Sequence, residues 1–234
     1  MLNRDCSKVE IKKINSGVGL FATTDIAKDE IVLVDSVAIG YEIQIKDMQL
    51  PAGDSCFVVK ELITDPTLLA KFKALNLSTI QGVYETPEGE NKKYLRKLAK
   101  KYKWLLIDVI ELWRVVSIYQ VTYHYITDSG DCLNRVQLSP IHSSVNHSCD
   151  PNIQVPFVYE SHEDYNSGLA PLYAKKDIIK DEELTFSYHS AVIRIMNLEI
   201  PFEYCPVGVR RDILMDYYNF NCMCKRCIEE SKNK

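Results

Sequence analysis

The sequence lacks a long apolar run without charges. In its most apolar region, only residues 115–127 are free of Asp, Glu, Lys and Arg, and this stretch is too short to span a bilayer. The first thirteen residues carry charges where a signal peptide needs an apolar core. We therefore expect an intracellular protein, nuclear or cytoplasmic, with no signal peptide, no transmembrane segment and no membrane partner.

The sequence also has no excess of positively charged residues. Lys and Arg number 28 against 32 Asp and Glu, which gives a net charge of −4. Proteins that bind nucleic acids directly carry a basic balance or a basic patch, so the composition predicts no nucleic-acid partner. One local run, KKYLRKLAKKYK at residues 92–103, is basic. It has the spacing of an amphipathic helix, and a solvated helix face is the favoured interpretation.

Disulfide bonds are not expected, because the eight cysteines accompany no secretion signal. Three of them, Cys222, Cys224 and Cys227, lie within six residues. Thiolates at this spacing can bind one zinc ion at about 2.3 Å each; the alternative is three free cysteines on a frayed tail. A structural zinc site takes four ligands. Any of the five other cysteines could supply the fourth, and Cys149 is the most interesting candidate because it would tie the tail to a polar segment.

The hydrophobic pattern predicts short strands around a block of helices. Residues 9–14 alternate apolar and polar side chains, as a half-buried strand does. Apolar side chains then recur at helical spacing within residues 66–127. Strand-like runs return after this block, and residues 207–220 are expected to form one helix. We therefore expect an α+β, mostly β fold, with a domain over residues 1–205, a helical insert at about 66–127, and a helix with a cysteine-rich segment over 206–234.

Polar chemistry is concentrated in HSSVNHSCDPN, residues 142–152. A surface turn would explain the Asp-Pro-Asn, but not obviously the Asn-His-Ser-Cys before it. Taken one at a time, the neighbouring motifs favour structural interpretations. The glycines of NSGVG suit a hairpin turn, Tyr188 suits a packing residue at the end of a strand, and His147 suits a hydrogen-bonded histidine.

Read in order along the chain, the motifs carry more information than they do separately. GVGLFAT is followed by NHSCDPN, then by EELTFSY, and finally by YYNFNCMCKRC. This order resembles the SET-domain protein lysine methyltransferases, and SVNHSCDPN with the Arg-Arg-x-x-Leu before the last cysteines is similar to their SMYD branch. The resemblance covers residues from about 7 to 49 and 132 to 228. The chain departs from SMYD proteins in residues 44–66, which hold one cysteine and no histidine, so no MYND finger is expected. A helical C-terminal domain after Cys227 is not expected either.

The resemblance implies a SET fold of short twisted sheets, with a knot-like threading of the C-terminal segment and a small zinc-binding post-SET tail. It implies S-adenosylmethionine and one structural zinc ion as cofactors. By this likeness, Tyr188 is the catalytic-site tyrosine, Phe186 and Tyr218 line the channel for a target lysine, and Phe220 stacks on adenine. The residues implied to bind S-adenosylmethionine are Ser16, Gly17, Val18, Gly19, Leu20, Asn134, Ser143, Asn146, His147, Tyr188 and Phe220. The residues implied to bind zinc are Cys149, Cys222, Cys224 and Cys227.

The implied activity is methyl transfer from S-adenosylmethionine to the side-chain amine of a lysine in a protein, histone or non-histone. A histone tail as substrate would make the chain a chromatin regulator, and we expect it to act as a monomer. Two alternatives stay open: an inactive SET-fold module that binds peptides or chromatin, and a purely structural zinc domain. The intact Asn146, His147 and Tyr188 favour the enzyme.

Overall fold

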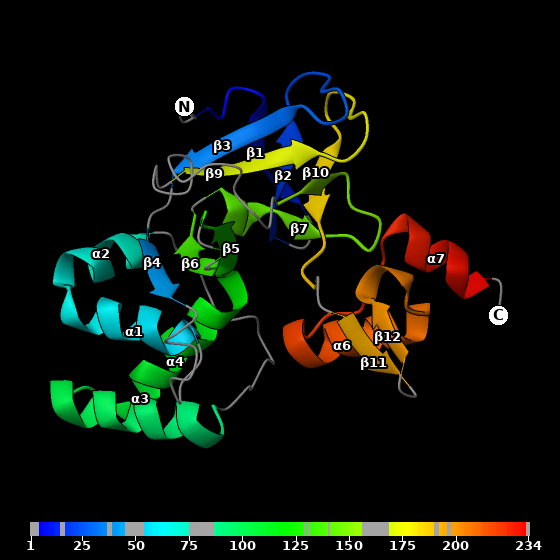
Figure 1. Ribbon diagram of the computed structural model, residues 1–234. Coiled ribbons are helices and arrows are strands. Elements are labelled where there is room, and N and C mark those ends of the chain that lie inside the picture. Colours follow the sequence, from blue (N-terminus) through cyan, green and yellow to red (C-terminus); the bar gives the residue numbers. More distant parts are fainter. Residues whose placement is uncertain are drawn as a thin grey trace.

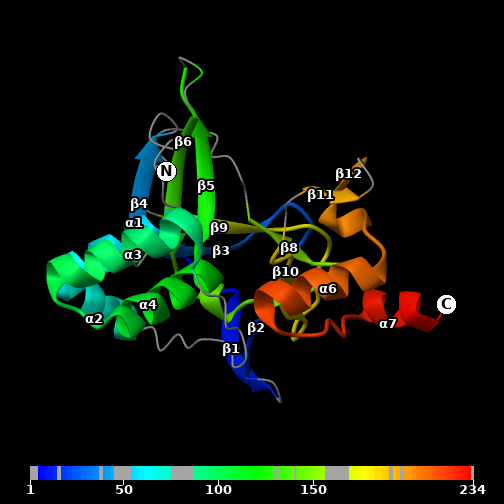
Figure 2. The same cartoon turned by 90° about the horizontal axis from the view of Figure 1, so that it is seen from below.

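Most of the short strands lie together, and two separate groups of helices lie beside them, one of which includes the hairpin of β11 and β12 (Figure 1). Helices α1–α4 lie on one side and α6 and α7 on the other, and the view from below shows the same separation (Figure 2). The computed structural model describes residues 5–14, 17–36, 39–44, 54–74, 87–128, 130, 132–139, 141–155, 169–189, 192–195 and 198–232.

The first sheet brings three of the sequence motifs together. It has the order β1-β2-β10-β7. Its strands are β1 (Val9–Ile14), β2 (Gly17–Ala22), β10 (Glu183–Phe186) and β7 (Asn146–His147). β2 is antiparallel to both β1 and β10, whereas β10 and β7 are parallel. At the start of β2, Gly17 has a φ of 132°, a conformation that glycine adopts at little steric cost. Because β2 pairs with β10, the glycine motif lies beside the strand that leads to Tyr188.

The second sheet packs its apolar side chains against those of the first. Its order is β3-β9-β8, with β3 at Ile31–Ser36, β9 at Leu169–Ala174 and β8 at Ile153–Gln154. Leu20 of β2, Leu184 of β10 and Leu172 of β9 are all completely buried in one core. Burial of each such side chain contributes about 1.5–3 kcal/mol. This shared core fixes the strands on which the polar motifs lie.

The helical insert has its own core and its own small sheet. The helices are α1 (Asp54–Thr64), α2 (Pro66–Ala74), α3 (Gly89–Tyr102) and α4 (Leu106–Tyr119). The strands are β4 (Ile39–Gln44), β5 (Val121–Ile126) and β6 (Cys132–Leu138), in the order β4-β6-β5. Leu62, Leu95 and Val116 are completely buried between the helices.

The limits of the insert differ from those expected from the sequence. Helices begin at Asp54 and end at Tyr119, in place of about 66–127. Residues 121–126 form a strand because β-branched and aromatic side chains favour a pleated surface and because β6 is available as an antiparallel partner. The apolar spacing of α4 runs into this strand without a polar break, so the sequence pattern alone does not separate the two.

The C-terminal part consists of a hairpin and two helices. β11 (Val192–Ile195) and β12 (Leu198–Pro201) pair antiparallel, and α6 (Val207–Tyr218) and α7 (Lys225–Lys232) follow. The helix expected over 207–220 ends at Tyr218, because Asn219 has a φ of 53° and terminates it. Small sheets with two groups of helices confirm the expected α+β class. Among the described residues, no helix has the length and apolar character needed to cross a membrane.

Candidate functional site

A parallel strand pair lies at the centre of the candidate site. Asn146 is paired with Thr185, and His147 with Phe186. The buried residue Asn152 holds the segment that follows β7 to β10. Its side-chain amide donates to the Glu183 carbonyl oxygen at 2.8 Å, and its side-chain oxygen accepts from the Thr185 N–H at 2.8 Å. The last residue of the polar sequence NHSCDPN therefore fixes the two segments side by side.

Asn146 connects this pair to the glycine strand. Its Nδ2 donates to the Val18 carbonyl oxygen at 2.9 Å and to Oε1 of Glu183 at 2.8 Å. Gly19 lies against the same groups: a Cβ atom at this position would be 2.8 Å from Glu183 Oε1 and 3.2 Å from Asn146 Nδ2. The absence of a side chain at Gly19 therefore allows three segments of the chain to meet.

Gly19→Ala is expected to lower the free energy of unfolding by about 1–3 kcal/mol, because the new methyl group must displace the Glu183 carboxylate from Asn146. Urea unfolding measures the change. Val18→Ala is the neighbouring control. Because the Val18 side chain is exposed, this substitution should change the free energy of unfolding by less than about 0.5 kcal/mol. Adding Glu183→Ala removes the clash, so the double variant should lose less stability than the two single losses together. Additive losses would contradict this contact.

His147 joins the strand pair to the cysteines. Its Nδ1 accepts a hydrogen bond from the Tyr188 N–H at 3.0 Å, and its Nε2 lies 3.2 Å from the sulfur of Cys149. Burial lowers the pKa of His147 to about 4, so the ring is neutral near pH 7. Since Nδ1 accepts, the single ring proton lies on Nε2 and is directed at the Cys149 sulfur.

Tyr188 is held by hydrogen bonds at both its hydroxyl and its backbone. Its hydroxyl donates to the Val145 carbonyl oxygen at 2.9 Å, and its own carbonyl oxygen accepts from the Tyr218 hydroxyl at 2.9 Å. Burial, followed by the nearby Tyr119, Tyr218 and Glu183, raises the pKa of the Tyr188 hydroxyl well above its usual value of 10.0. The hydroxyl therefore stays protonated at neutral pH, and Tyr188 is poorly suited to act as a general base.

Aromatic rings from three parts of the chain surround Tyr188. Its ring centroid lies 5.3 Å from those of His147 and Phe186, 5.2 Å from that of Tyr218, and 6.1 Å from that of Phe220. These rings come from β7, β10 and the segment that ends α6. Such an assembly excludes water and attracts cations to the ring faces.

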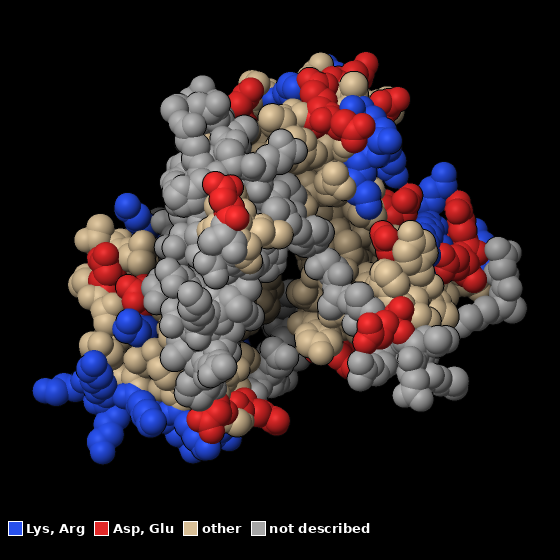
Figure 3. Space-filling model, in the orientation of Figure 1, with Lys and Arg blue, Asp and Glu red and all other residues tan. Residues whose placement is uncertain are grey.

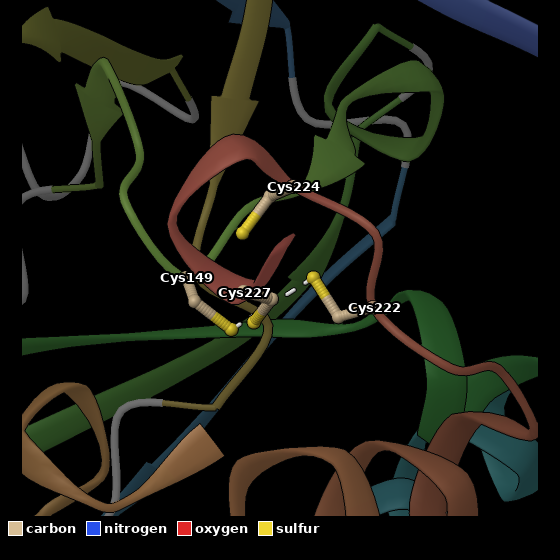
Figure 4. A group of neighbouring side chains, drawn as sticks. All are labelled: Cys149, Cys222, Cys224 and Cys227. Atoms are coloured by element: carbon tan, nitrogen blue, oxygen red, sulfur yellow. Dashed lines mark hydrogen bonds between the residues drawn. The ribbon is translucent and has the colours of Figure 1, made fainter. Parts of the chain in front are cut away.

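Four cysteines converge beside this aromatic cluster (Figure 4). Cys149 comes from the segment after β7, and Cys222, Cys224 and Cys227 come from the tail. All four sulfur atoms lie within 4.8 Å of one another, and those of Cys149 and Cys222 are 3.8 Å apart. A tetrahedral zinc site with bonds of about 2.3 Å places its sulfurs about 3.8 Å apart. The cluster therefore fits a zinc ion in donor type, number and spacing.

Arginines hold the tail around the cysteines. Arg210 is completely buried, donates to the Cys227 sulfur at 3.4 Å and forms an ion pair with Glu230 at 2.9 Å. Arg226 donates to the Cys149 carbonyl oxygen at 3.1 Å, and Arg211 donates to that of Cys222 at 3.0 Å. These positive groups offset the negative charge that the cysteines carry as thiolates, the form that binds metals.

The other residues singled out in the sequence are less central. Ser143 donates to the Ser139 carbonyl oxygen at 2.9 Å, within the short 3₁₀ turn at His142–Ser144. Asn134 lies in β6, opposite Ile43 and His124, and its side chain is outside the described structure. Ser16 also lies outside the described residues.

Sequence reasoning missed three contributors to the site: Glu183, Asn152 and Arg210. Each contacts a residue or strand that the sequence motifs had already indicated, and none belongs to a motif with a distinctive residue spacing. A faint signal existed for all three, since Glu183 is in EELTFSY, Asn152 ends NHSCDPN, and Arg210 begins the Arg-Arg-x-x-Leu pattern.

Comparisons with known proteins agree with this geometry. A family model of the SET domain matches residues 17–189. The chain is 32% identical to histone-lysine N-methyltransferase ATXR2 of Arabidopsis thaliana over 104 residues, which cover 44% of this chain and only 18% of that protein. It is 23% identical to the putative SET domain-containing protein L678 of Acanthamoeba polyphaga mimivirus, over 97% of this chain and 78% of that protein.

The fold is also similar to a solved structure of Rubisco LSMT bound to AdoMet. The TM-score is 0.50 and the identity 14%, over 93% of this chain and 52% of that one, so this likeness concerns the fold alone. The residues matched by the family model include β2, β7 and β10, the strands that meet at Asn146 and Tyr188. The chain therefore belongs to the SET domain family.

Proposed function

We propose that this chain is an S-adenosylmethionine-dependent protein-lysine N-methyltransferase whose substrate is a lysine in a histone or another protein. The observation that carries the proposal is the parallel pairing of β7 with β10, which places Asn146 and His147 beside the strand that leads to Tyr188. The SET-domain relatives include proteins named histone-lysine methyltransferases, and AdoMet is bound by a protein of similar fold.

The residues between β2 and the aromatic cluster suit a cationic cofactor. When bound, S-adenosylmethionine supplies an electrophilic methyl group on a positively charged sulfonium. Glu183 places a carboxylate beside the backbone of Gly19, and the rings around Tyr188 favour a cation at their faces. In this proposal the backbone of Gly17–Leu20, together with Asn146 and His147, binds the cofactor, and Phe220 packs against adenine.

Tyr188, Phe186 and Tyr218 are proposed to orient the lysine amine. A lysine has a pKa of about 10.4 in water, and it must lose a proton before its nitrogen can attack. Loss of water around the amine, together with the positive charge of the nearby sulfonium, would outweigh the attraction of the rings for a cation and favour the neutral form. The raised pKa of Tyr188 makes its oxygen a poor acceptor for this proton, so the proton is proposed to leave to solvent before the rings enclose the amine. Alignment of the nitrogen with the methyl carbon can contribute up to about 7–11 kcal/mol to rate acceleration.

The four cysteines would hold one zinc ion in a structural role. Cys149 belongs to the segment after β7, whereas the other three belong to the tail that carries Phe220. The ion would thus fasten Phe220 and Tyr218 over the strand pair. The Nε2–H of His147, 3.2 Å from the Cys149 sulfur, would stabilise that thiolate and link the metal site to the cofactor site.

Asn146→Asp is expected to weaken S-adenosylmethionine binding by roughly tenfold or more, since it replaces the amide donor with a carboxylate facing Glu183 and the Val18 carbonyl oxygen. Combining it with Glu183→Gln should recover part of the affinity, because the new amide can donate to the new carboxylate. Isothermal titration calorimetry measures both variants. Equal affinity of Asn146→Asp and the parent protein would contradict the proposed role of Asn146.

The same titration tests the proposed function on the parent protein. Saturable binding of one S-adenosylmethionine per chain is expected from folded, zinc-containing protein. Absence of binding in that protein would exclude the enzyme and favour the inactive SET-fold module.

A further inference from the structure

Helix α3 carries a concentration of positive charge that the methyl-transfer site does not use. Seven of the twelve residues 92–103 are Lys or Arg, and none is acidic. All seven are exposed. They form what we call the basic face, which consists of Lys92, Lys93, Arg96, Lys97, Lys100, Lys101 and Lys103. Figure 3 shows these basic side chains gathered at the lower left, over the position of α3 in Figure 1.

The charge of the remaining chain makes this concentration unusual. The other 222 residues hold 21 Lys and Arg against 32 Asp and Glu, a net charge of −11. The overall value of −4 is therefore an average of a strongly basic helix and an acidic remainder. This average is the reason that composition alone predicts no nucleic-acid partner.

The basic face is separated cleanly from the core side of the helix. With 3.6 residues per turn, the six cations within α3 cover about half of its circumference. Leu95, Leu98 and Ala99 are buried on the opposite side. The apolar side chains of α3 are thus already used in packing the insert, and only its charges are available to a partner.

The arrangement of the cations is unfavourable for the isolated helix. They form two rows at four-residue spacing: Lys92, Arg96 and Lys100, then Lys93, Lys97 and Lys101. Like charges at this spacing destabilise a helix, whereas solvated helix faces commonly mix the two signs. Within the described part of the chain, Lys93 alone among the seven forms an ion pair, with Glu90. Among the described residues, the basic face therefore has few counter-charges to balance it.

We propose that the basic face of α3 binds double-stranded nucleic acid through its phosphates, without reading base sequence. B-form DNA presents one negative charge per about 1.7 Å of helix axis, and residues 92–102 of α3 extend about 16 Å, so several phosphates lie within reach. Six of the seven side chains are lysines, and a lysine binds phosphate as a point charge, without the fixed geometry of a bidentate arginine. A membrane surface is a poorer match, because stable binding of a helix to a bilayer combines charge with an inserted apolar face, and the apolar face of α3 is packed in the core.

Fluorescence anisotropy with a short labelled DNA duplex of mixed sequence, without S-adenosylmethionine, tests this interface independently of the proposed enzyme. Replacing Lys92, Arg96 and Lys100 by Gln removes one row of charge, and Gln has a helix propensity close to that of Lys and Arg. The affinity at low salt should fall roughly tenfold or more, and the slope of log K against log salt should become shallower by about 0.9 for each phosphate that the variant no longer neutralises. The matched control replaces the exposed Lys28, Lys71 and Lys180 by Gln and should change the affinity less than about twofold.

Three results would overturn the proposal. One is no binding of the duplex by the folded parent protein at low salt. A second is an equal loss of affinity in the triple variant of α3 and in the matched control, which would indicate a non-specific charge effect. The third is preferential binding to vesicles that contain phosphatidylserine, lost in the same α3 variant, which would assign the face to a membrane surface. Circular dichroism of all variants establishes that they are folded.

Discussion

Replacing Tyr188 by Phe is expected to lower the rate of methyl transfer by roughly 100-fold or more, the cost typical of removing one preorganised polar group from a reacting centre. The hydroxyl donates to the Val145 carbonyl oxygen, which holds its oxygen in one position, beside the proposed site of the lysine amine. The ring is unchanged and keeps its packing against His147 and Phe220. Cofactor affinity should therefore change by less than about threefold.

Single-turnover rates with labelled S-adenosylmethionine, measured beside calorimetric affinities, separate these two effects. Tyr204→Phe is the matched control, because the Tyr204 side chain is 71% exposed and its hydroxyl should not affect the rate. If the Tyr188→Phe variant transferred methyl groups at nearly the parent rate, the hydroxyl would have no role in the mechanism. A variant that instead loses cofactor affinity would assign Tyr188 to binding alone.

Loss of the metal is expected to unfold the tail and with it the cofactor site. The small core of this region consists of Cys149, Phe202, Val207, Leu214, Cys222 and Cys227, so half of its buried residues are the proposed ligands themselves. Structural zinc contributes on the order of 10–16 kcal/mol in comparable small sites, more than such a core can supply. Cys224→Ser, or a strong chelator, should therefore expose residues 206–232 and lower S-adenosylmethionine affinity at least about tenfold.

Hydrogen exchange of the tail and the zinc content per chain are the two readouts. The parent protein should hold one zinc, and amides of α6 and α7 should be protected only while it is bound. Cys6→Ser is the control, since Cys6 lies outside the cluster, where its thiol donates to the Val34 carbonyl oxygen. A zinc-free protein with a protected tail and undiminished cofactor affinity would contradict a structural metal.

Much of the site could be anticipated from residue order, because SET-like motifs are short and contiguous. NHSCDPN and EELTFSY each place their polar residues within one strand and its flanking turn, so the pairing of β7 with β10 brings them together as units. The meeting of Cys149 with the three tail cysteines requires, in addition, that the tail fold back onto the segment after β7. A fourth ligand 73 residues away had no signal beyond its residue type and the resemblance.

Interactions between segments and the charge of single faces were harder to predict. Glu183 meets Asn146 only because a glycine at position 19 leaves space for both side chains, and no one-dimensional pattern encodes that space. Arg210 has the sequence context of an ordinary polar helix residue, yet it is completely buried against Cys227 and Glu230. The strand at Val121–Ile126 continues the apolar spacing of α4, and its identity depends on pairing with β6. For Glu183 and Arg210 the decisive partner lies on another segment of the chain, and for Val121–Ile126 it lies across a hairpin.

The most direct test of the account is to incubate zinc-loaded protein and S-adenosylmethionine carrying a labelled methyl group with core histones and with a whole-cell protein lysate, and then to locate the label by mass spectrometry. The account predicts label on the side-chain nitrogen of lysine residues, in histones or in other proteins, and its loss in Tyr188→Phe. Label on any other atom, or no label from protein that binds the cofactor, would contradict a lysine methyltransferase.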